Sequence, residues 1–370
     1  MGTLGRPRTV DFMIFFSAFW SILTLFYHHP ANEALESSGI LFVETYGAYA
    51  LARWLVRDAD DFLALARALF MVIVCLLPFG LFELFTGRPV LIDFLGAFLN
   101  VYPNVPHEIR LGMDRVQGTF EHPILFGVFC STGFALSVYV LGYNQSVTKT
   151  MIRAGTVVLS VFISLSSGPL SAIGAQVALT CWDLALKSIR QRWVILFWLF
   201  VAAYIAVDIL SNRTPLEVLV SYISFNPSTG YVRILIFEYG GAEVMRNPIM
   251  GIGFHDWQRL SWMSASVDMF WLVPAMRHGL PAALSLAFGY LYMIVAAGRK
   301  KISDERIRAY RTGLVLSLVG LGLAGWGVHY WNATYCLLLF MLGSGAWILN
   351  SETAEPSTRA DPPRFGRRVR

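Results

Sequence analysis

The sequence is poor in charged residues. Only 14% of its 370 residues are Asp, Glu, Lys or Arg, whereas 56% are hydrophobic. Soluble domains usually carry about 25% charged residues, so this composition disfavours a soluble protein. The repeated long apolar runs instead indicate a polytopic protein of the lipid bilayer. The net charge of +5 is not a nucleic-acid signal, because the basic residues stand between apolar runs, where they set orientation in the membrane.

Metal-binding and redox patterns are also missing. The four cysteines lie inside or at the edge of apolar runs, with no CxxC spacing: Cys75, Cys130, Cys181 and Cys336. Small buried side chains explain them better than a disulfide framework or a metal site. No HExxH, P-loop or GxSxG motif is present. We therefore assign no metal ligand and no cofactor from the sequence.

Several apolar runs have the length of a membrane span. They predict spans near 10–27, 39–55, 62–86, 123–142, 193–210 and 279–297. No small-residue cleavage site follows the first run, so we expect a span there rather than a removed signal. Two longer runs, 151–182 and 312–349, are interrupted by Ser166-Ser167-Gly168-Pro169 and near His329 and Trp331. Each is either one long span or two short ones.

The distribution of basic residues favours two short spans in each case. With ten spans and a cytoplasmic N-terminus, most of the 29 Lys and Arg residues fall in inside segments. If 151–182 were one span, the basic cluster at 299–311 would face outside. We therefore expect an all-α bundle of about ten spans with both termini cytoplasmic. Residues 1–349 form one transmembrane domain, and the polar, arginine-rich tail 350–370 is expected to be disordered.

This topology leaves two sizeable external segments, 87–122 and 211–268, the longer one with short helices. The first ends in Arg115-Val-Gln-Gly118-Thr-Phe-Glu121-His-Pro, just before a span. An arginine there can make bidentate contacts to phosphate oxygens, and a nearby glycine permits close backbone approach. The alternative is an interfacial anchor, or a partner for Asp114 or Glu121.

The longer segment supplies a second arginine, Arg233, with apolar and aromatic residues on both sides. A charge in such a run is costly unless it is paired or faces water. Its structural partner would be Glu217, Glu238 or Glu243. Glu243 and Arg246 stand three residues apart, so we interpret them as a structural pair on a helix.

The remaining candidates lie between residues 247 and 278. His255 and Asp256 follow a Gly-Ile-Gly turn and are capable of acid–base chemistry, although a loop histidine is more often plain polar surface. Asp268 is either the N-cap of the next helix or a carboxylate that takes a proton from an attacking hydroxyl. Arg277 and His278 are supporting candidates beside it.

The order, spacing and membrane placement of these motifs resemble the O-antigen ligase and O-antigen polymerase superfamily of bacterial envelope proteins, over roughly residues 60–350. The motifs that carry the resemblance are Arg115-Val-Gln-Gly-Thr-Phe-Glu-His-Pro, Leu165-Ser-Ser-Gly-Pro, Arg233 with Asn247-Pro-Ile-Met-Gly-Ile-Gly, and the stretch from Asp268 to Gly279.

The resemblance implies metal-independent transfer of a glycan from an undecaprenyl-diphosphate carrier at the periplasmic face of the bacterial inner membrane. Arg115 and Arg233 would bind the diphosphate, with Gly118 and Glu121 in support. The acceptor would be lipid A core in a ligase, or another carrier-linked repeat unit in a polymerase of O-antigen or exopolysaccharide. A chain-length regulator would then be a partner of the polymerase.

Two departures from the family pattern matter, and the second favours a polymerase over a ligase. Many members have Ser-Arg-Gly at the span break, where this chain has Ser167-Gly168. Ligases usually carry a His-Asn pair where this chain has Asp268, so a histidine mechanism does not transfer, and His255 and His278 remain substitutes. From other classes, a transporter of lipid-linked sugars or a non-catalytic scaffold stays open. A transporter is disfavoured because the charge is concentrated in loops rather than at midplane.

Overall fold

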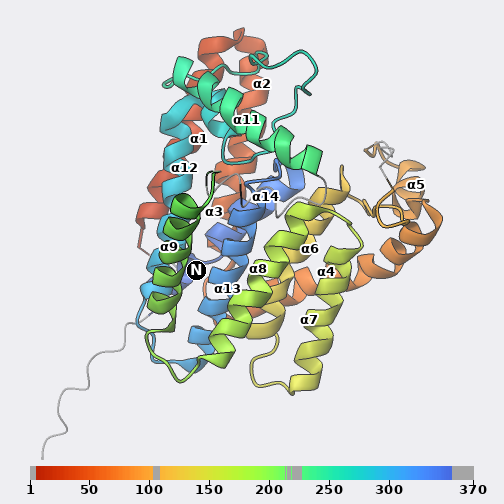
Figure 1. The fold of residues 1–370 in the computed structure, drawn as a ribbon, viewed down its shortest axis with the longest axis vertical. Coiled ribbons are helices and arrows are strands. Elements are labelled where there is room, and N and C mark those ends of the chain that lie inside the picture. The colour runs from red at the N-terminus through yellow and green to blue at the C-terminus, as the bar shows by residue number, and fades with distance from the viewer. Residues whose placement is uncertain (1–5, 103–108, 213, 215–217, 219–226, 352–370) are drawn as a thin grey trace, which may run out of the picture.

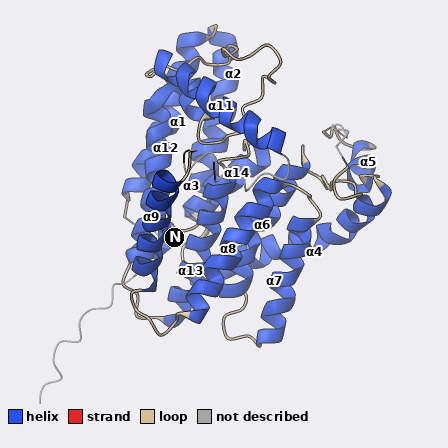
Figure 2. Cartoon of the chain, in the orientation of Figure 1, coloured by secondary structure: helices blue, strands red, loops and turns tan. Residues whose placement is uncertain are grey.

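The apolar runs form helices throughout the described chain. The computed structural model describes residues 6–102, 109–212, 214, 218 and 227–351, and within them it contains no β-strand (Figure 1, Figure 2). The predicted all-α class is thus confirmed. The elements are α1 (Thr9–His28), α2 (Ala31–Phe42), a π-helical turn η1 (Val43–Gly47), α3 (Ala48–Leu55), α4 (Ala59–Thr86), α5 (Val90–Gly96), α6 (Pro123–Tyr139), α7 (Val147–Phe162), α8 (Ser167–Ala185), α9 (Arg192–Leu210), α11 (Pro227–Arg246), α12 (Val273–Arg299), α13 (Glu305–Ala324), α14 (Asn332–Gly343) and α15 (Ala346–Asn350).

Short polar side chains begin several helices. The Asp58 carboxylate accepts two backbone N–H bonds at 2.9 Å in the first turn of α4, and Asp304 accepts one from Ile307 at 3.1 Å at the start of α13. Gly87 ends α4 in the left-handed region, with φ 66°, where glycine carries no Cβ penalty. Helix boundaries therefore follow local chemistry.

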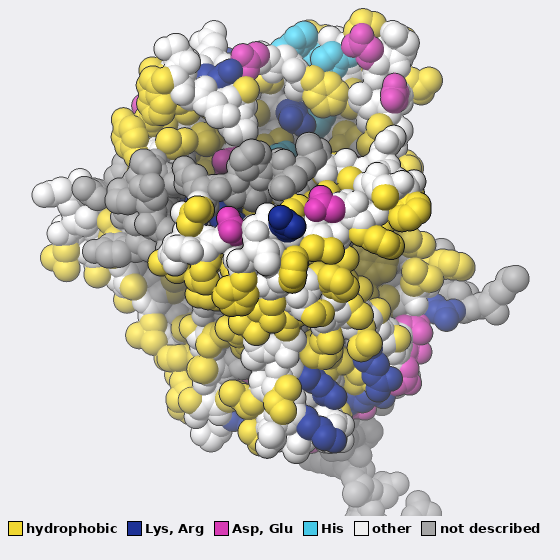
Figure 3. All heavy atoms as spheres, turned by 90° about the vertical axis from the view of Figure 1, so that its right-hand side faces the viewer, with side chains coloured by type: hydrophobic (Ala, Val, Ile, Leu, Met, Phe, Trp, Pro, Cys, Tyr) yellow, Lys and Arg dark blue, Asp and Glu magenta, His cyan; other side chains and the backbone are white. Residues whose placement is uncertain are grey.

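Six helical segments within the described residues are long and apolar enough to cross a membrane. They are α1, α4, α9, α12, α13 and the α14–α15 segment 332–350. By length and composition the chain is a multi-pass helical membrane protein. None of the side chains of α9 is buried, so this helix presents most of its apolar surface outward. Figure 3 shows a similarly broad hydrophobic surface on another face of the molecule.

Both interrupted runs are broken in the structure. The run 151–182 divides into α7 and α8 around residues 163–166, and the run 312–349 divides into α13 and α14 around residues 325–331. Gly279, with φ 79°, also interrupts α12 and separates its first residues from the rest of the helix. The predicted breaks are confirmed. The tail beyond Ser351 lies outside the described residues.

The core is organised around α13, which packs against α6, α8, α12 and α14. The approach of α8 is close at Gly320, where an added Cβ would lie 2.3 Å from Gln176 Nε2. Gln176 also hydrogen-bonds the backbone of α6, donating to the Ser131 carbonyl at 2.9 Å. A small residue on α13 and a buried amide on α8 thus join three helices.

One end of the bundle gathers the basic segments. Arg8 Nη2 and Lys300 Nζ both donate to the Leu349 carbonyl, at 2.9 and 3.1 Å, and Arg306 pairs with Asp60. Residues from the N-terminus, the first turns of α4 and α13, the α12–α13 loop and α15 therefore share this end. Figure 3 shows Lys and Arg side chains gathered below the hydrophobic surface. The sequence prediction grouped the same segments on one side.

Candidate functional site

The break between α7 and α8 forms the centre of the candidate site. Residues 163–166 make a turn in which Leu165 has φ 45°, a left-handed conformation that a non-glycine residue adopts at a cost in free energy. The Val116 backbone N–H donates to the Ile163 carbonyl at 3.2 Å. This bond ties the segment that precedes α6 to the break.

Two arginines of that segment reach the break. Arg110 Nη1 donates to the Leu165 carbonyl at 2.9 Å, and Arg115 Nη2 donates to Ser166 Oγ at 2.8 Å. The Arg115 side chain is buried. The two guanidinium groups are therefore attached to adjacent residues of one turn.

A third arginine arrives from α11. Arg233 Nη2 lies 3.5 Å from Ser167 Oγ and donates to the Gly327 carbonyl at 3.0 Å. Since consecutive Cα atoms are about 3.8 Å apart, the three residues to which the arginines attach, 165 to 167, lie within about 8 Å of one another. The structure thus brings together the two predicted arginines and adds Arg110.

The segment that carries Asp268 is held by the same loop as the Arg233 side chain. Two residues after Asp268, the Phe270 N–H donates to the carbonyls of Gly325 and Val328, at 2.8 and 3.0 Å. The loop between α13 and α14 therefore holds both this segment and the Arg233 guanidinium. Helix α12 begins only at Val273, with Leu272 as its N-cap, so the capping interpretation of Asp268 is wrong.

The charges of the site act on one another. Burial lowers the pKa of Arg233, nearby Asp268 raises it and nearby Arg110 lowers it further; a guanidinium nevertheless stays cationic. The Asp268 carboxyl keeps solvent contact, but the surrounding protein atoms desolvate it and raise its pKa. The Arg233 charge and a hydrogen bond from Ser266 oppose that rise.

Gly118 and Glu121 make contacts that hold the segment before α6 in place. The N–H groups of Gln117 and Gly118 both donate to the Glu83 carboxylate of α4, at 2.7 and 3.1 Å. Gly118 has φ 63°, and a Cβ there would lie 3.2 Å from the Phe126 ring. Glu121 accepts a bond from Asn332 Nδ2 at 3.0 Å. Both residues thus have structural partners.

The two histidines predicted as substitutes have other surroundings. The His255 ring stacks on His29, with centroids 5.2 Å apart, and lies 5.9 Å from His28 at the end of α1. His278 is buried, and its Nδ1 lies 2.8 Å from Thr24 Oγ1. The His255 contacts join the end of α1 to the loop before α12, and the His278 contact joins α1 to α12 itself, so both histidines have a role in packing. Among the described residues, no group of three His, Cys, Asp or Glu side chains is arranged to hold a metal ion.

Arg277 of α12 lies near His329, which belongs to the α13–α14 loop. The Arg277 guanidinium lies over the Phe254 ring, 5.5 Å from its centroid, and has no ion pair among the described residues. Burial and the Arg277 charge lower the pKa of His329 to about 4. His329 is therefore neutral at pH 7, two residues from the carbonyl that holds Arg233.

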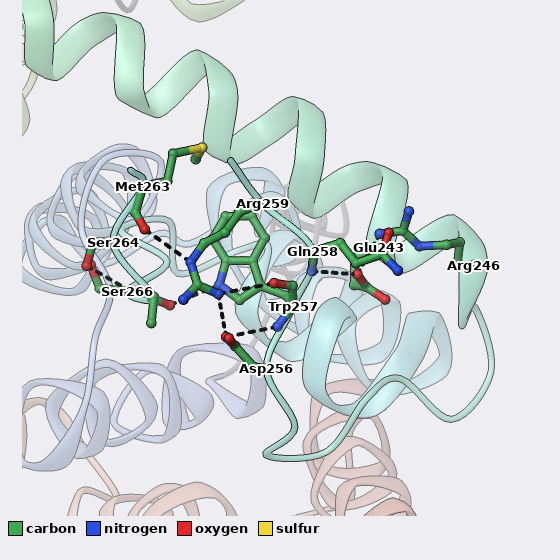
Figure 4. Close-up of polar contacts among 10 residues, drawn as sticks. Glu243, Arg246, Asp256, Trp257, Gln258, Arg259, Met263, Ser264 and Ser266 are labelled. Atoms are coloured by element: carbon green, nitrogen blue, oxygen red, sulfur yellow. Dashed lines mark hydrogen bonds and ion pairs between the residues drawn. The ribbon is translucent and has the colours of Figure 1, made fainter. Parts of the chain in front are cut away.

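The segment 256–266 is held by one internal ion pair and by hydrogen bonds, and Glu243 of α11 contacts it (Figure 4). Arg259 pairs with Asp256, so this aspartate is engaged. Glu243 accepts bonds from Arg246 at 2.6 Å and from the Gln258 N–H at 3.1 Å. Burial alone would raise the pKa of Glu243, but these hydrogen bonds and the Arg246 charge lower it. The predicted structural pair is confirmed.

Sequence reasoning missed three residues of this region: Arg110, Glu83 and His329. Arg110 precedes Arg115 by five residues in the same polar segment, which was a usable signal. Glu83 stands inside an apolar run, where a carboxylate needs a partner, so it too was detectable. His329 was used only as a helix-break marker. Comparison of the sequence with protein-family models and with curated proteins gives no match.

Proposed function

We propose that this protein is a metal-independent glycosyltransferase of the bacterial inner membrane. It takes a glycan from an undecaprenyl-diphosphate-linked donor at the periplasmic face and polymerises exopolysaccharide or O-antigen repeat units. One observation carries the proposal: Arg110, Arg115 and Arg233 converge on a single helix break, with Asp268 beside Arg233. Three cations and one carboxylate suit a diphosphate leaving group and a hydroxyl nucleophile.

The chemistry has two demands that this arrangement meets. The acceptor hydroxyl attacks the anomeric carbon of the donor while the bond from that carbon to the diphosphate oxygen breaks. Negative charge develops on the leaving diphosphate, and preorganised guanidinium groups stabilise it without reorganisation. The hydroxyl proton passes to a base, for which the desolvated Asp268 carboxylate is the first candidate and neutral His329 the second.

The proposal includes the ten-span topology. Besides the six long apolar segments, four shorter or more polar traverses fill the count: α2–α3, α6, α7 and α8. Helix α7 begins beside the basic end, where Tyr143 and Arg306 line one cavity, and ends at the break that Arg110 contacts. Helix α8 returns from the break to the Asp183–Arg192 ion pair. Basic segments at one end support a cytoplasmic location for that end.

The test replaces each of the three arginines with alanine. In a host that lacks the gene, polymer on gels should lose its long chains with Arg115→Ala, Arg233→Ala or Arg110→Ala. Loss of one donor to developing charge costs about 100-fold or more in rate. In vitro transfer from a purified lipid-linked donor, without any ion gradient, should fall in parallel.

Arg308→Ala is the matched control, because Arg308 forms an exposed pair with Glu305 at the opposite end, and such pairs contribute little. Normal long-chain polymer from all three site variants at wild-type protein levels would rule out the proposal. Glycan found attached to lipid A core would instead assign the ligase reaction. Transfer that requires a gradient, or no transfer at all, would favour a transporter or a scaffold.

A further inference from the structure

A cavity of about 720 Å³ lies at the basic end of the bundle, away from the three-arginine site. Arg67 of α4, Arg153 of α7 and Arg306 of α13 line it, together with Tyr143 and Met71. Glu83, which holds the segment before α6, is also on α4, about 24 Å along the helix from Arg67. The cavity is therefore separate from the candidate site.

The lining of this cavity is positively charged. It includes the three arginines and no Asp or Glu. Arg306 pairs with Asp60 and Arg153 donates to the Leu141 carbonyl, whereas Arg67 has no hydrogen bond or ion pair among the described residues. Arg67 lies about 12 Å into α4, a candidate span, where an uncompensated guanidinium is costly. An anion in the cavity would offset that cost.

The cavity is lined by both polar and apolar side chains. Asn144 and Gln145 of the α6–α7 turn are exposed and contribute amides to the lining. Met71, about one helical turn after Arg67 on α4, lines the cavity and is 56% exposed; Met151 and Ile152, which directly precede the cavity-lining Arg153 on α7, are also exposed. A ligand with an anionic head and apolar chains matches this combination of surfaces.

We propose that this cavity binds the phosphodiester head group of an anionic membrane phospholipid. The guanidinium groups of Arg67 and Arg153 contact the phosphate oxygens, and the acyl chains leave past Met71 along the outer face of α4. Basic pockets between helices at the cytoplasmic side of a membrane are suited to such head groups. The site is independent of glycan transfer, so it stands or falls on binding alone.

The experiment measures lipid binding to the purified full-length protein in a neutral detergent. Dioleoyl-phosphatidylglycerol should raise the thermal unfolding midpoint of the wild type in a saturable manner, and dioleoyl-phosphatidylcholine should not. Arg67→Gln should bind phosphatidylglycerol about fivefold more weakly, as loss of one basic contact near a membrane predicts. Arg308→Gln, an exposed arginine at the same end that does not line the cavity, should bind like the wild type.

Met71→Trp is the second variant, because it keeps every arginine and narrows the lipid-facing edge. It should also weaken binding of phosphatidylglycerol, so the proposal remains testable if Arg67→Gln does not fold. Equal binding by the wild type and both cavity variants would overturn the proposal. So would full stabilisation by inorganic phosphate or by glycerol phosphate, since that would indicate a site for a free anion rather than for a lipid.

Discussion

Arg233 donates a hydrogen bond to the Gly327 carbonyl at 3.0 Å, although 94 residues separate the two in the chain. The guanidinium lies over the glycine so closely that an added Cβ would be 3.2 Å from Arg233 Cζ. The α13–α14 loop therefore sets the position of an arginine that belongs to α11. The same loop accepts the Phe270 N–H and so positions the segment that carries Asp268.

Gly327→Ala should lower glycan transfer by displacing the Arg233 side chain. A methyl group at 3.2 Å forces the guanidinium to shift by a few tenths of an ångström, and we expect a loss of about tenfold, with Gly327→Val losing more. Transfer rate from a purified lipid-linked donor is the measurement. Gly241→Ala in α11 is the control, since nothing lies within 4 Å of the added Cβ there. Equal rates for Gly327→Ala and Gly241→Ala would contradict this role of the loop.

Much of the fold was predictable from local patterns. Apolar length identified the long helices, and Ser166-Ser167-Gly168-Pro169 marked the α7–α8 break because serines, glycine and proline interrupt apolar periodicity. The Glu243–Arg246 pair followed from helical spacing alone. These features depend on residues close together in the sequence.

The site depends on residues far apart, and there the sequence was less informative. Nothing local predicts that Arg110 reaches the Leu165 carbonyl, or that the α13–α14 loop holds Arg233. Asp268 stands shortly before the next span, a position typical of a helix cap. However, α12 begins only at Val273, with Leu272 as its N-cap. His255 carried a chemical signal of equal strength, yet tertiary packing places it against His29. Tertiary contacts, which single-sequence patterns do not encode, distinguish the surroundings of Asp268 from those of His255.

The pH dependence of transfer should report on Asp268. A base must be ionised, and desolvation raises the pKa of this carboxyl, so activity should fall as the pH decreases through a value above that of an ordinary aspartate. Arg233→Ala should move this acidic limb to higher pH in the residual activity, because the Arg233 charge lowers the Asp268 pKa.

The isosteric variant Asp268→Asn separates the two candidate bases. It should abolish the acidic limb together with most of the rate, whereas His329→Gln should leave the limb in place. A limb that persists in Asp268→Asn near pH 4, where His329 titrates, would assign the proton to the histidine instead. Rates measured from pH 4 to pH 9 with one purified donor decide between them.

Reporter fusions test the ten-span arrangement directly. Fusions after Asn144 and after Ser303 should report the same, cytoplasmic side, and a fusion after Ser264 should report the opposite side. The reason is the α7–α8 break. If α7 and α8 each cross the membrane, the basic segment after α8 lies on the same side as Asn144; if they form one span together, it lies on the opposite side. A paired alkaline phosphatase and green fluorescent protein fusion at each position gives complementary signals. Opposite sides for Asn144 and Ser303 would mean that α7 and α8 cross the membrane only once between them, and the three arginines would then lose a common periplasmic face.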